Sequence, residues 1–250
     1  VEQVSEALGT DQWLCAFRFA VEQKSKVRGC DDACRNSVND ATGRSEKLEV
    51  TGTDEIIAVV SELVRRLKAK GIDPKLAAWI LDESDAYRQI PIDPAHRKYS
   101  VIVLRKPGGG VGFTIMVGHS FGNVASVYNY NRRSDLVDRI LKRLFWTLSF
   151  YYFDDKFAFE TEDTIETSNK CAELVHTLLG IDFEERKRYS GRVPTVLGVK
   201  YDLERLRIAV TEERKADLVA EIDSIIGHNG CQTLTKGQAA KLKGLSLIHI

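Results

Sequence analysis

The sequence has no excess of charge of either sign. It contains 36 Lys and Arg residues and 36 Asp and Glu residues, so the formal net charge of its 250 residues is zero. A strongly basic balance is the usual electrostatic sign of a nucleic-acid-binding protein. The overall charge therefore argues against such a partner, unless the charges are unevenly distributed along the chain.

Long apolar runs are also absent. The longest covers residues 144–153 and is interrupted by Thr147 and Ser149, and it is far shorter than the roughly 20 residues that span a bilayer. The start of the chain has no signal-peptide pattern. We therefore expect no membrane partner. Because the first residue is Val1, we also expect a fragment of a longer protein.

No zinc-binding pattern is present either. The five cysteines are scattered, and Cys30 and Cys34 have no second Cys or His pair to complete a site. The five histidines form no ligand pattern. We interpret the cysteines as buried reduced thiols, which are typical of an intracellular protein of the cytoplasm or nucleus.

The composition, 43% hydrophobic and 29% charged, is that of an ordinary globular protein. Hydrophobic periodicity predicts helices and strands without a βαβ rhythm, which indicates an α+β fold. The predicted helices cover residues 54–70 with Thr53 as cap, 123–143, 164–179 and 211–226, and a last one begins near residue 235. The predicted strands cover residues 76–81, 99–105, 111–117, 145–153, 157–160, 193–201 and 206–210.

Two adjacent acids, Asp154 and Asp155, follow Tyr152 and Phe153 at the tip of a predicted hairpin. Neighbouring carboxylates repel each other, and a divalent cation such as Mg²⁺ removes that repulsion. A polar β-turn explains the same residues without a metal, since Asp is common in turns. Alone, this motif is weak.

A third acid, Asp82, stands at the end of the predicted buried strand 76–81. If this strand lies beside the hairpin, Asp82, Asp154 and Asp155 converge. Three such carboxylates can hold two Mg²⁺ ions, which act on the attacking and leaving oxygens of a phosphoryl transfer.

Several further motifs stand in a fixed order around these acids. Residues 24–39, 82–92, 121–132, 178–187 and 196–199, together with 152–155, resemble the motifs of retrotransposon reverse transcriptases in order and spacing. The resemblance covers roughly residues 15–210. Phe121-Gly122 and the helix after it are more similar to the DIRS-like and related protist elements than to retroviruses.

The resemblance implies a right-hand polymerase fold. Fingers would occupy residues 1–75, and a palm with an antiparallel sheet and the catalytic carboxylates would occupy residues 76–205. Residues 206–250 would form part of a helical thumb or connection. The last six residues do not continue the pattern, so we expect a truncated C-terminus.

The resemblance also implies roles for individual residues. Asp82, Asp154 and Asp155 would be catalytic ligands of two Mg²⁺ ions, or of Mn²⁺, with the carbonyl group of Glu83 as a further ligand. The implied nucleotide-binding residues are Lys24 and Arg28 on the triphosphate, Asp85, Ala86 and Tyr87 near the sugar, Phe121 and Gly122 on the nascent pair, and Lys187 as proton donor to pyrophosphate. Tyr152, Phe153, Leu197 and Gly198 would contact the primer.

Each role has a simpler alternative. Tyr87 could be a core aromatic residue, Lys187 part of a solvated charge run, and Lys24 and Arg28 ordinary surface residues. The chain also departs from the family, because His119 and Ser120 precede Phe121 where a Pro is usual, and Gly29 and Ala33 replace commoner residues.

Three functional interpretations follow. The first is an RNA-directed DNA polymerase that uses an RNA or DNA template, a primer and dNTPs. The second is a catalytically decayed relic that at most binds nucleic acid. The third is another metal-dependent phosphotransferase or an RNA-templated RNA polymerase.

The charges are in fact unevenly distributed. Residues 111–150 carry an excess of basic side chains, and residues 151–180 carry an excess of acidic ones. The basic stretch includes the helix after Phe121-Gly122, where a template backbone would run. Neutrality is therefore a cancellation of local charges, and we expect weaker, more salt-sensitive template binding than in a more basic enzyme.

Overall fold

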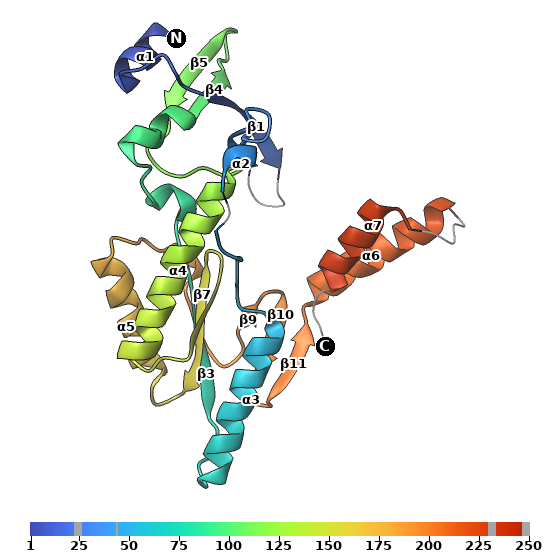
Figure 1. The fold of residues 1–250 in the computed structure, drawn as a ribbon. Helices are drawn as coiled ribbons and strands as arrows, with labels where there is room; N and C mark the ends of the chain where they lie inside the picture. The colour runs from blue at the N-terminus through green and yellow to red at the C-terminus, as the bar shows by residue number, and fades with distance from the viewer. Residues whose placement is uncertain (23–26, 44, 230–233, 247–250) are drawn as a thin grey trace. The chain divides into compact units, whose positions relative to one another are not determined.

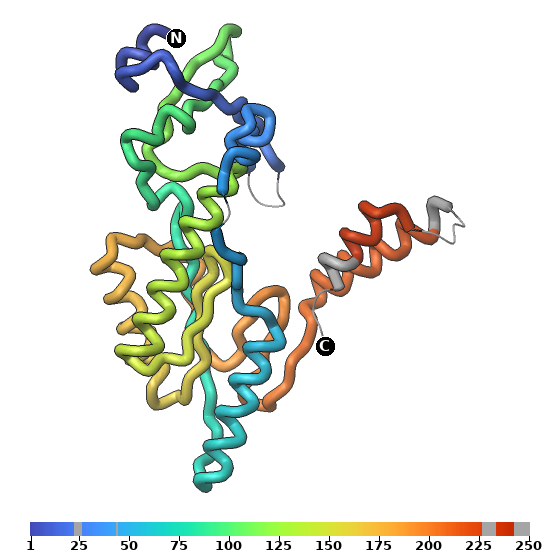
Figure 2. The backbone as a smooth tube through the Cα atoms, viewed as in Figure 1, coloured from blue at the N-terminus to red at the C-terminus, as the bar shows by residue number. Residues whose placement is uncertain are grey.

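The computed structural model describes residues 1–22, 27–43, 45–229 and 234–246 (Figures 1 and 2). The chain forms two compact units, and each is built from separate stretches of sequence. The first unit comprises Val1–Glu49 and Glu83–Val137, and the second comprises Val50–Asp82 and Asp138–Ile250.

The first unit contains a four-stranded sheet of order β2-β1-β4-β5. Its strands are β1 (Cys15–Glu22), β2 (Val27–Asp31), β4 (Val101–Arg105) and β5 (Val111–Ile115). β1 and β4 are parallel, whereas the other pairs are antiparallel. The predicted strands 99–105 and 111–117 are therefore confirmed in β4 and β5, which form a hairpin through Lys-Pro-Gly-Gly-Gly, with a core of Ile92, Ile102 and Met116 beside it.

Short helices complete this unit. They are α1 (Glu2–Leu8), α2 (Val38–Ala41) and the 3₁₀ helices η1 (Ala86–Gln89) and η2 (Pro94–Tyr99). The long helix α4 (Val124–Leu144) begins here, close to its predicted position. Its buried residues recur at helical spacing and are Ser126, Tyr130, Asn131, Ser134, Val137, Asp138 and Leu141.

The second unit is organised around an antiparallel sheet of order β6-β7-β3-β8. Its strands are β6 (Ser149–Tyr152), β7 (Asp155–Thr161), β3 (Leu76–Asp82) and β8 (Tyr189–Gly191). β3 is buried along almost its whole length, as its apolar sequence predicts.

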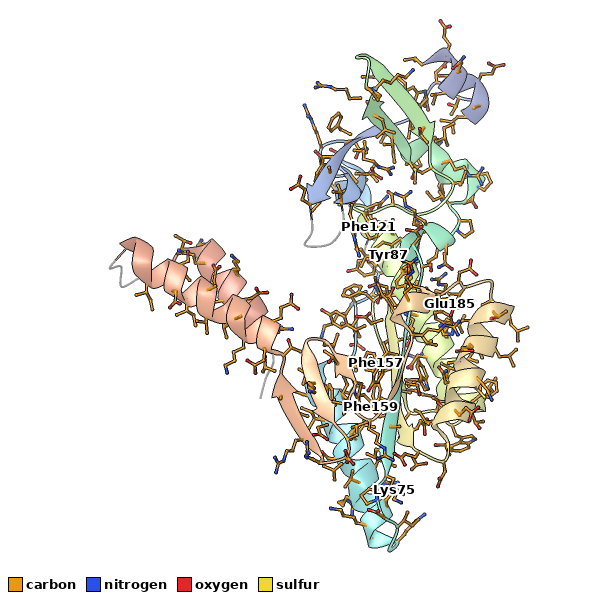
Figure 3. The ribbon with its side chains drawn as sticks, turned by 180° about the vertical axis from the view of Figure 1, so that it is seen from behind. Lys75, Tyr87, Phe121, Phe157, Phe159 and Glu185 are labelled. Atoms are coloured by element: carbon orange, nitrogen blue, oxygen red, sulfur yellow. The ribbon has the colours of Figure 1, made fainter. Side chains whose placement is uncertain are left out.

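The two faces of β3 meet different helices because successive side chains of a strand point to opposite sides. Ala78 lies in a core with Phe157, Phe159 and Ile56 of α3 (Thr53–Ala69) (Figure 3). On the other face, the indole nitrogen of Trp79 donates a hydrogen bond of 2.8 Å to Ser168 of α5 (Ile165–Leu178). Helices on both faces thus fix the strand that ends at Asp82.

A smaller sheet and a helix pair form the C-terminal part. The sheet has the order β11-β10-β9, with β9 (Thr195–Val196), β10 (Val199–Asp202) and β11 (Arg207–Val210). Helix α6 (Glu212–Asn229) packs against α7 (Lys236–Ser246), and an ion pair joins Glu221 to Lys241. A short 3₁₀ helix, η3 (Glu185–Lys187), precedes β8.

Several expectations need correction. The predicted strand 193–201 is divided by a turn at Leu197 and Gly198, because both residues have a positive φ. The N-cap of α3 is Gly52 and not the predicted Thr53, which is the first residue of the helix. Cys15 and Cys34 are exposed thiols and not buried ones.

The α+β class is confirmed. The boundaries of fingers, palm and thumb at residues 75 and 205 stay predictions. In the part of the chain that the structure describes, no helix has the length and apolar character to cross a membrane.

Candidate active site

The structure brings two of the three predicted metal-binding acids together on neighbouring strands. Asp82 is the last residue of β3, Asp155 is the first residue of β7, and the two are paired directly across the antiparallel ladder. Directly opposed residues have Cβ atoms roughly 5 Å apart. Asp154 precedes Asp155 in the loop that joins β6 to β7. The sheet therefore gathers the three carboxylates at one end of two strands.

This arrangement concentrates negative charge. Burial, and to a smaller extent the charges of Asp154 and Asp82, raise the pKa of Asp155 from 3.8 to about 6. Lys156 and Lys187 act in the opposite direction, but their effects are smaller. The carboxylate of Asp155 is therefore held in an environment that disfavours its charge.

Lys187 contacts the same acids. Its ammonium group donates a hydrogen bond of 2.7 Å to Oδ2 of Asp82, and its side chain is half exposed. The backbone N–H of Glu184 donates to the carbonyl oxygen of Asp82 at 2.8 Å, which holds the segment around η3 against the end of β3. Glu185, which is labelled in Figure 3, marks the start of η3. Lys187 is thus an ion-pair partner of Asp82, and the simpler interpretation as a solvated charge run is insufficient.

The donor atoms in this cluster are carboxylate oxygens, which suit a hard divalent cation such as Mg²⁺. Among the described residues, however, no three Asp, Glu, His or Cys side chains are arranged as a group that could hold a metal ion. One oxygen of Asp82 is bonded to Lys187 instead. The residue types therefore fit the cation, while the side-chain arrangement is that of a lysine-neutralised cluster.

The turn next to these acids has an unusual backbone. Phe153 has a φ of 51°, a conformation that bulky residues rarely adopt. Lys156 Nζ donates to its carbonyl oxygen at 2.7 Å, and the rings of Tyr152 and Phe153 meet edge to face at 5.0 Å. Such conformations are concentrated at functional sites.

A second tight turn lies in the same unit at the other predicted primer-binding residues. Leu197 and Gly198 have φ values of 53° and 75° and join β9 to β10, as in a type I′ hairpin. Arg214 of α6 donates from Nη1 to the carbonyl oxygen of Leu197 at 2.9 Å. The sequence motifs gave no sign of this arginine, because its partner lies 17 positions earlier in the chain.

In the first unit, the predicted sugar-binding residue Tyr87 belongs to an aromatic cluster. Its ring meets those of Phe121 and Tyr130 edge to face, each at 5.0 Å (Figure 3). Arg28 lies over the ring of Phe121 at 5.1 Å. Tyr87, Phe121 and Arg28 are thus brought into one cluster, and Tyr130 is a member that motif reasoning missed.

Gly122 stands where the backbone of another segment comes very close. Its φ is 99°, and a Cβ atom there would lie 2.1 Å from the carbonyl oxygen of Asp31. The amide group of Asn39 donates to the carbonyl of Gly122 at 2.9 Å and accepts from the N–H of Val124 at 2.8 Å. The backbone that comes close to Gly122 is therefore the end of β2.

The remaining predicted residues have different surroundings. The Glu83 side chain is buried and ion-paired with Arg133. Asp85 is exposed with a φ of 45°, and Ala86 is buried at the start of η1. Lys24 lies outside the described residues.

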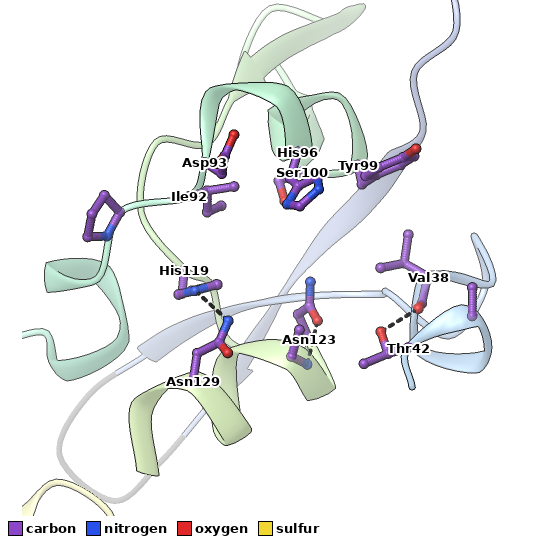
Figure 4. Close-up of a pocket in the computed structure, with 13 residues that line it drawn as sticks. Val38, Thr42, Ile92, Asp93, His96, Tyr99, Ser100, His119, Asn123 and Asn129 are labelled. Atoms are coloured by element: carbon purple, nitrogen blue, oxygen red, sulfur yellow. Dashed lines mark hydrogen bonds between the residues drawn. The ribbon is translucent and has the colours of Figure 1, made fainter. Parts of the chain in front are cut away.

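A cavity of about 620 Å³ is present in the first unit (Figure 4). Asn129 accepts from Arg132 at 3.0 Å, so its NH₂ group faces Nε2 of His119 at 3.2 Å. This nitrogen is therefore the acceptor, and the histidine proton is on Nδ1. Burial lowers the pKa of His119. No sequence motif indicated this cavity, because its lining comes from four separate segments.

The sequence matches no protein-family model and no curated protein. Solved structures do match. The foamy viral protease-reverse transcriptase in complex with double-stranded DNA aligns with a TM-score of 0.61 and 17% identity, over 92% of this chain and 35% of that one. Telomerase from Candida albicans, in complex with a fragment of telomeric RNA, aligns with a TM-score of 0.60 and 11% identity, over 96% of this chain and 53% of that one.

Telomerase from Candida tropicalis aligns with a TM-score of 0.57 and 11% identity, over 80% of this chain and 55% of that one. The chain thus spans between about a third and about half of these proteins. At such identities the likeness concerns the fold alone. The chain shares its fold with these structures of a reverse transcriptase and of telomerases.

Proposed function

We propose that the chain is the RNA-directed DNA polymerase region of a retrotransposon reverse transcriptase, of the DIRS-like or a related protist type. It would extend a primer 3′-hydroxyl with deoxynucleotides along an RNA or DNA template. The observation that carries the proposal is the direct pairing of Asp82 with Asp155, next to Asp154, in a sheet of polymerase fold.

The carboxylates of Asp82, Asp154 and Asp155 would hold two Mg²⁺ ions, with Mn²⁺ as a substitute, and the Glu83 carbonyl group would be a further ligand. When bound, such ions stabilise the charge on the attacking and leaving oxygens of a phosphoryl transfer. The residue types support this assignment, since the cluster contains oxygen donors with an excess of negative charge.

Lys187 would have two roles. Before substrate binds, its ion pair with Asp82 neutralises part of the carboxylate charge. With Asp82 engaged by a cation, the half-exposed ammonium group of Lys187 would be available to donate a proton to the pyrophosphate leaving group. The 2.7 Å contact supports the placement of this lysine beside the reacting centre.

The remaining residues would bind the other substrates. Arg28 and Lys24 would bind the triphosphate, Tyr87 with Asp85 and Ala86 the sugar, and Phe121 and Gly122 the nascent base pair. Tyr152, Phe153, Leu197 and Gly198 would contact the primer. The aromatic cluster and the two tight turns support these roles, because they hold the residues in defined orientations.

Nucleic acid as the partner has separate support. The structural neighbours include a complex with double-stranded DNA, a complex with an RNA/DNA hybrid and a complex with telomeric RNA. As part of a retroelement, the chain would act inside the cell, in the cytoplasm or nucleus.

Primer extension tests the proposal. The chain is incubated with a primed RNA template, Mg²⁺ or Mn²⁺, and either dNTPs or NTPs. We expect extension with dNTPs, a loss to background for Asp154→Asn, and full activity for Asp163→Asn, which removes the same charge at an exposed turn. No extension with either metal would refute the polymerase assignment. Activity unchanged in Asp154→Asn would refute the site, and a preference for NTPs would favour an RNA polymerase.

A further inference from the structure

The ring of Tyr87 is held from two sides by other aromatic rings. Phe121 and Tyr130 both contact it edge to face, with interplanar angles of 71° and 87°. Edge-to-face contacts are directional, because the positive edge of one ring meets the negative face of the other. Two such contacts from different directions fix the orientation of the Tyr87 ring more firmly than either could alone.

Of these two neighbours, Tyr130 is the immobile one. It is fully buried, whereas Phe121 is partly exposed. It lies on α4 in the stripe of buried residues that recur at helical spacing. A side chain packed on all sides cannot change rotamer without displacing its neighbours. Tyr130 is therefore a fixed support for the ring of Tyr87.

An ion pair supports Tyr130 in turn. The guanidinium group of Arg133, one helical turn further along α4, lies over the Tyr130 ring at 5.0 Å. Arg133 is ion-paired with Glu83, whose side chain is 1% exposed. A buried carboxylate is costly to separate from its cation, so Arg133 cannot readily leave the ring. A continuous series of contacts thus runs from Glu83 through Arg133 and Tyr130 to Tyr87.

We propose that Tyr130, supported by the Arg133–Glu83 ion pair, is a positioning residue that determines how strongly the chain discriminates against nucleotides with a 2′-hydroxyl. This inference rests on the proposed function, in which Tyr87 lies against the sugar. A ring excludes a hydroxyl group only if it cannot turn aside, and displacements of about 1 Å suffice to lose such selectivity. Tyr130 itself touches no substrate in this scheme.

The test compares two variants of one residue. Tyr130→Leu removes the ring that supports Tyr87, and Tyr130→Phe keeps the ring and removes only the hydroxyl group. The measured quantity is the ratio of kcat/KM for dNTP to that for NTP in primer extension. We expect Tyr130→Leu to lower this ratio about fivefold to tenfold, the size of an aromatic pair contact. Tyr130→Phe should keep it within about twofold of wild type.

A second comparison separates positioning from general damage. In a Tyr87→Ala background the ring to be positioned is gone, so Tyr130→Leu should lower the dNTP/NTP ratio no further. A merely structural role would reduce activity with both nucleotide types and leave the ratio unchanged. An unchanged ratio in Tyr130→Leu, or equal effects in both backgrounds, would overturn the inference.

Two further measurements cover a failure of folding or of catalysis. If Tyr130→Leu does not fold by circular dichroism, Arg133→Met removes the supporting cation, and an unchanged ratio in that variant overturns the inference. If wild type extends no primer, the proposed function fails, and the affinities for unlabelled dATP and ATP, measured by isothermal titration calorimetry, replace the kinetic ratio. A preference for dATP that Tyr130→Leu abolishes would support the inference, and no preference in wild type would overturn it.

Discussion

The charge cluster around Asp155 should lower the stability of the folded chain at neutral pH. The pKa of Asp155 is raised from 3.8 to about 6, chiefly by burial and then by Asp154 and Asp82. Each pKa unit corresponds to about 1.4 kcal/mol of difference between the two protonation states. At pH 7.5 the carboxylate is ionised in the folded and unfolded chains, so the folded chain bears a cost of about 3 kcal/mol.

The substitution Asp155→Asn removes this charge and nearly preserves the shape of the side chain. Without divalent cations at pH 7.5, we expect it to raise the free energy of unfolding by up to about 3 kcal/mol. The sign follows from the direction of the shift. A raised folded-state pKa gives stability that is present below pH 3.8 and is lost as the pH rises through about 6. The gain from Asp155→Asn should therefore shrink as the pH falls from 7.5 to 5.

Urea denaturation is followed by circular dichroism in the presence of EDTA, at pH 5 and at pH 7.5. It measures the gain in the free energy of unfolding from Asp155→Asn and the change of this gain with pH. Asp163→Asn is the matched control, since it removes one carboxylate from an exposed turn and should change stability by less than about 0.5 kcal/mol. A stability gain that is absent at pH 7.5, or equally large at both pH values, would refute the reasoning. Under the proposed function, Mg²⁺ should stabilise wild type more than Asp155→Asn.

Two other predictions concern the first unit. Gly122→Ala should lower the free energy of unfolding by about 2–4 kcal/mol, because its Cβ atom would lie 2.1 Å from a carbonyl oxygen at a positive φ. Gly108→Ala, with nothing within 4 Å of the new atom, should be nearly neutral in the same urea titration, and equal effects would contradict the prediction. His119→Gln should weaken the loss of stability between pH 7 and pH 5, because burial lowers the pKa of His119 and protonation favours the unfolded chain. Parallel pH profiles of wild type and variant would exclude this role for His119.

Local sequence patterns predicted those features of the site that depend on neighbouring residues. An apolar strand that ends in Asp82, and an aromatic hairpin with Asp154 and Asp155 at its tip, are both recognisable from alternation and turn chemistry. Their convergence depended on one assumption, that the strand lies beside the hairpin. The pairing of β3 with β7 confirms it.

Contacts between distant segments could not be predicted in this way. Lys187 reaches Asp82 across 105 positions, and nothing in its own charged run distinguishes it from its neighbours. Tyr130 is one of two tyrosines in the predicted helix, and only the packing of α4 shows that it is the one in contact with Tyr87. Periodicity identifies the buried face of a helix but not the residues against which that face packs.

The acids of the chain differ in how their charge is compensated, and this difference points to the site. Asp31 accepts two hydrogen bonds from Arg18, at 2.7 and 3.0 Å, and Glu83 is paired with Arg133. These buried carboxylates are structural, because an arginine neutralises each within its own unit.

Asp155 is compensated in a different way. Two cations lower its pKa: Lys156, which donates a hydrogen bond to the carbonyl oxygen of Phe153, and Lys187, which donates one to Asp82. Desolvation and the two neighbouring acids outweigh them, so the pKa stays raised. Asp31 and Glu83 are each paired with an arginine, whereas the adjacent carboxylates of Asp82, Asp154 and Asp155 have two lysines nearby and keep negative charge that a divalent cation from solution can neutralise. The negative charge that the two lysines leave uncompensated is the physical reason why we propose the reaction site at the end of β3 and β7.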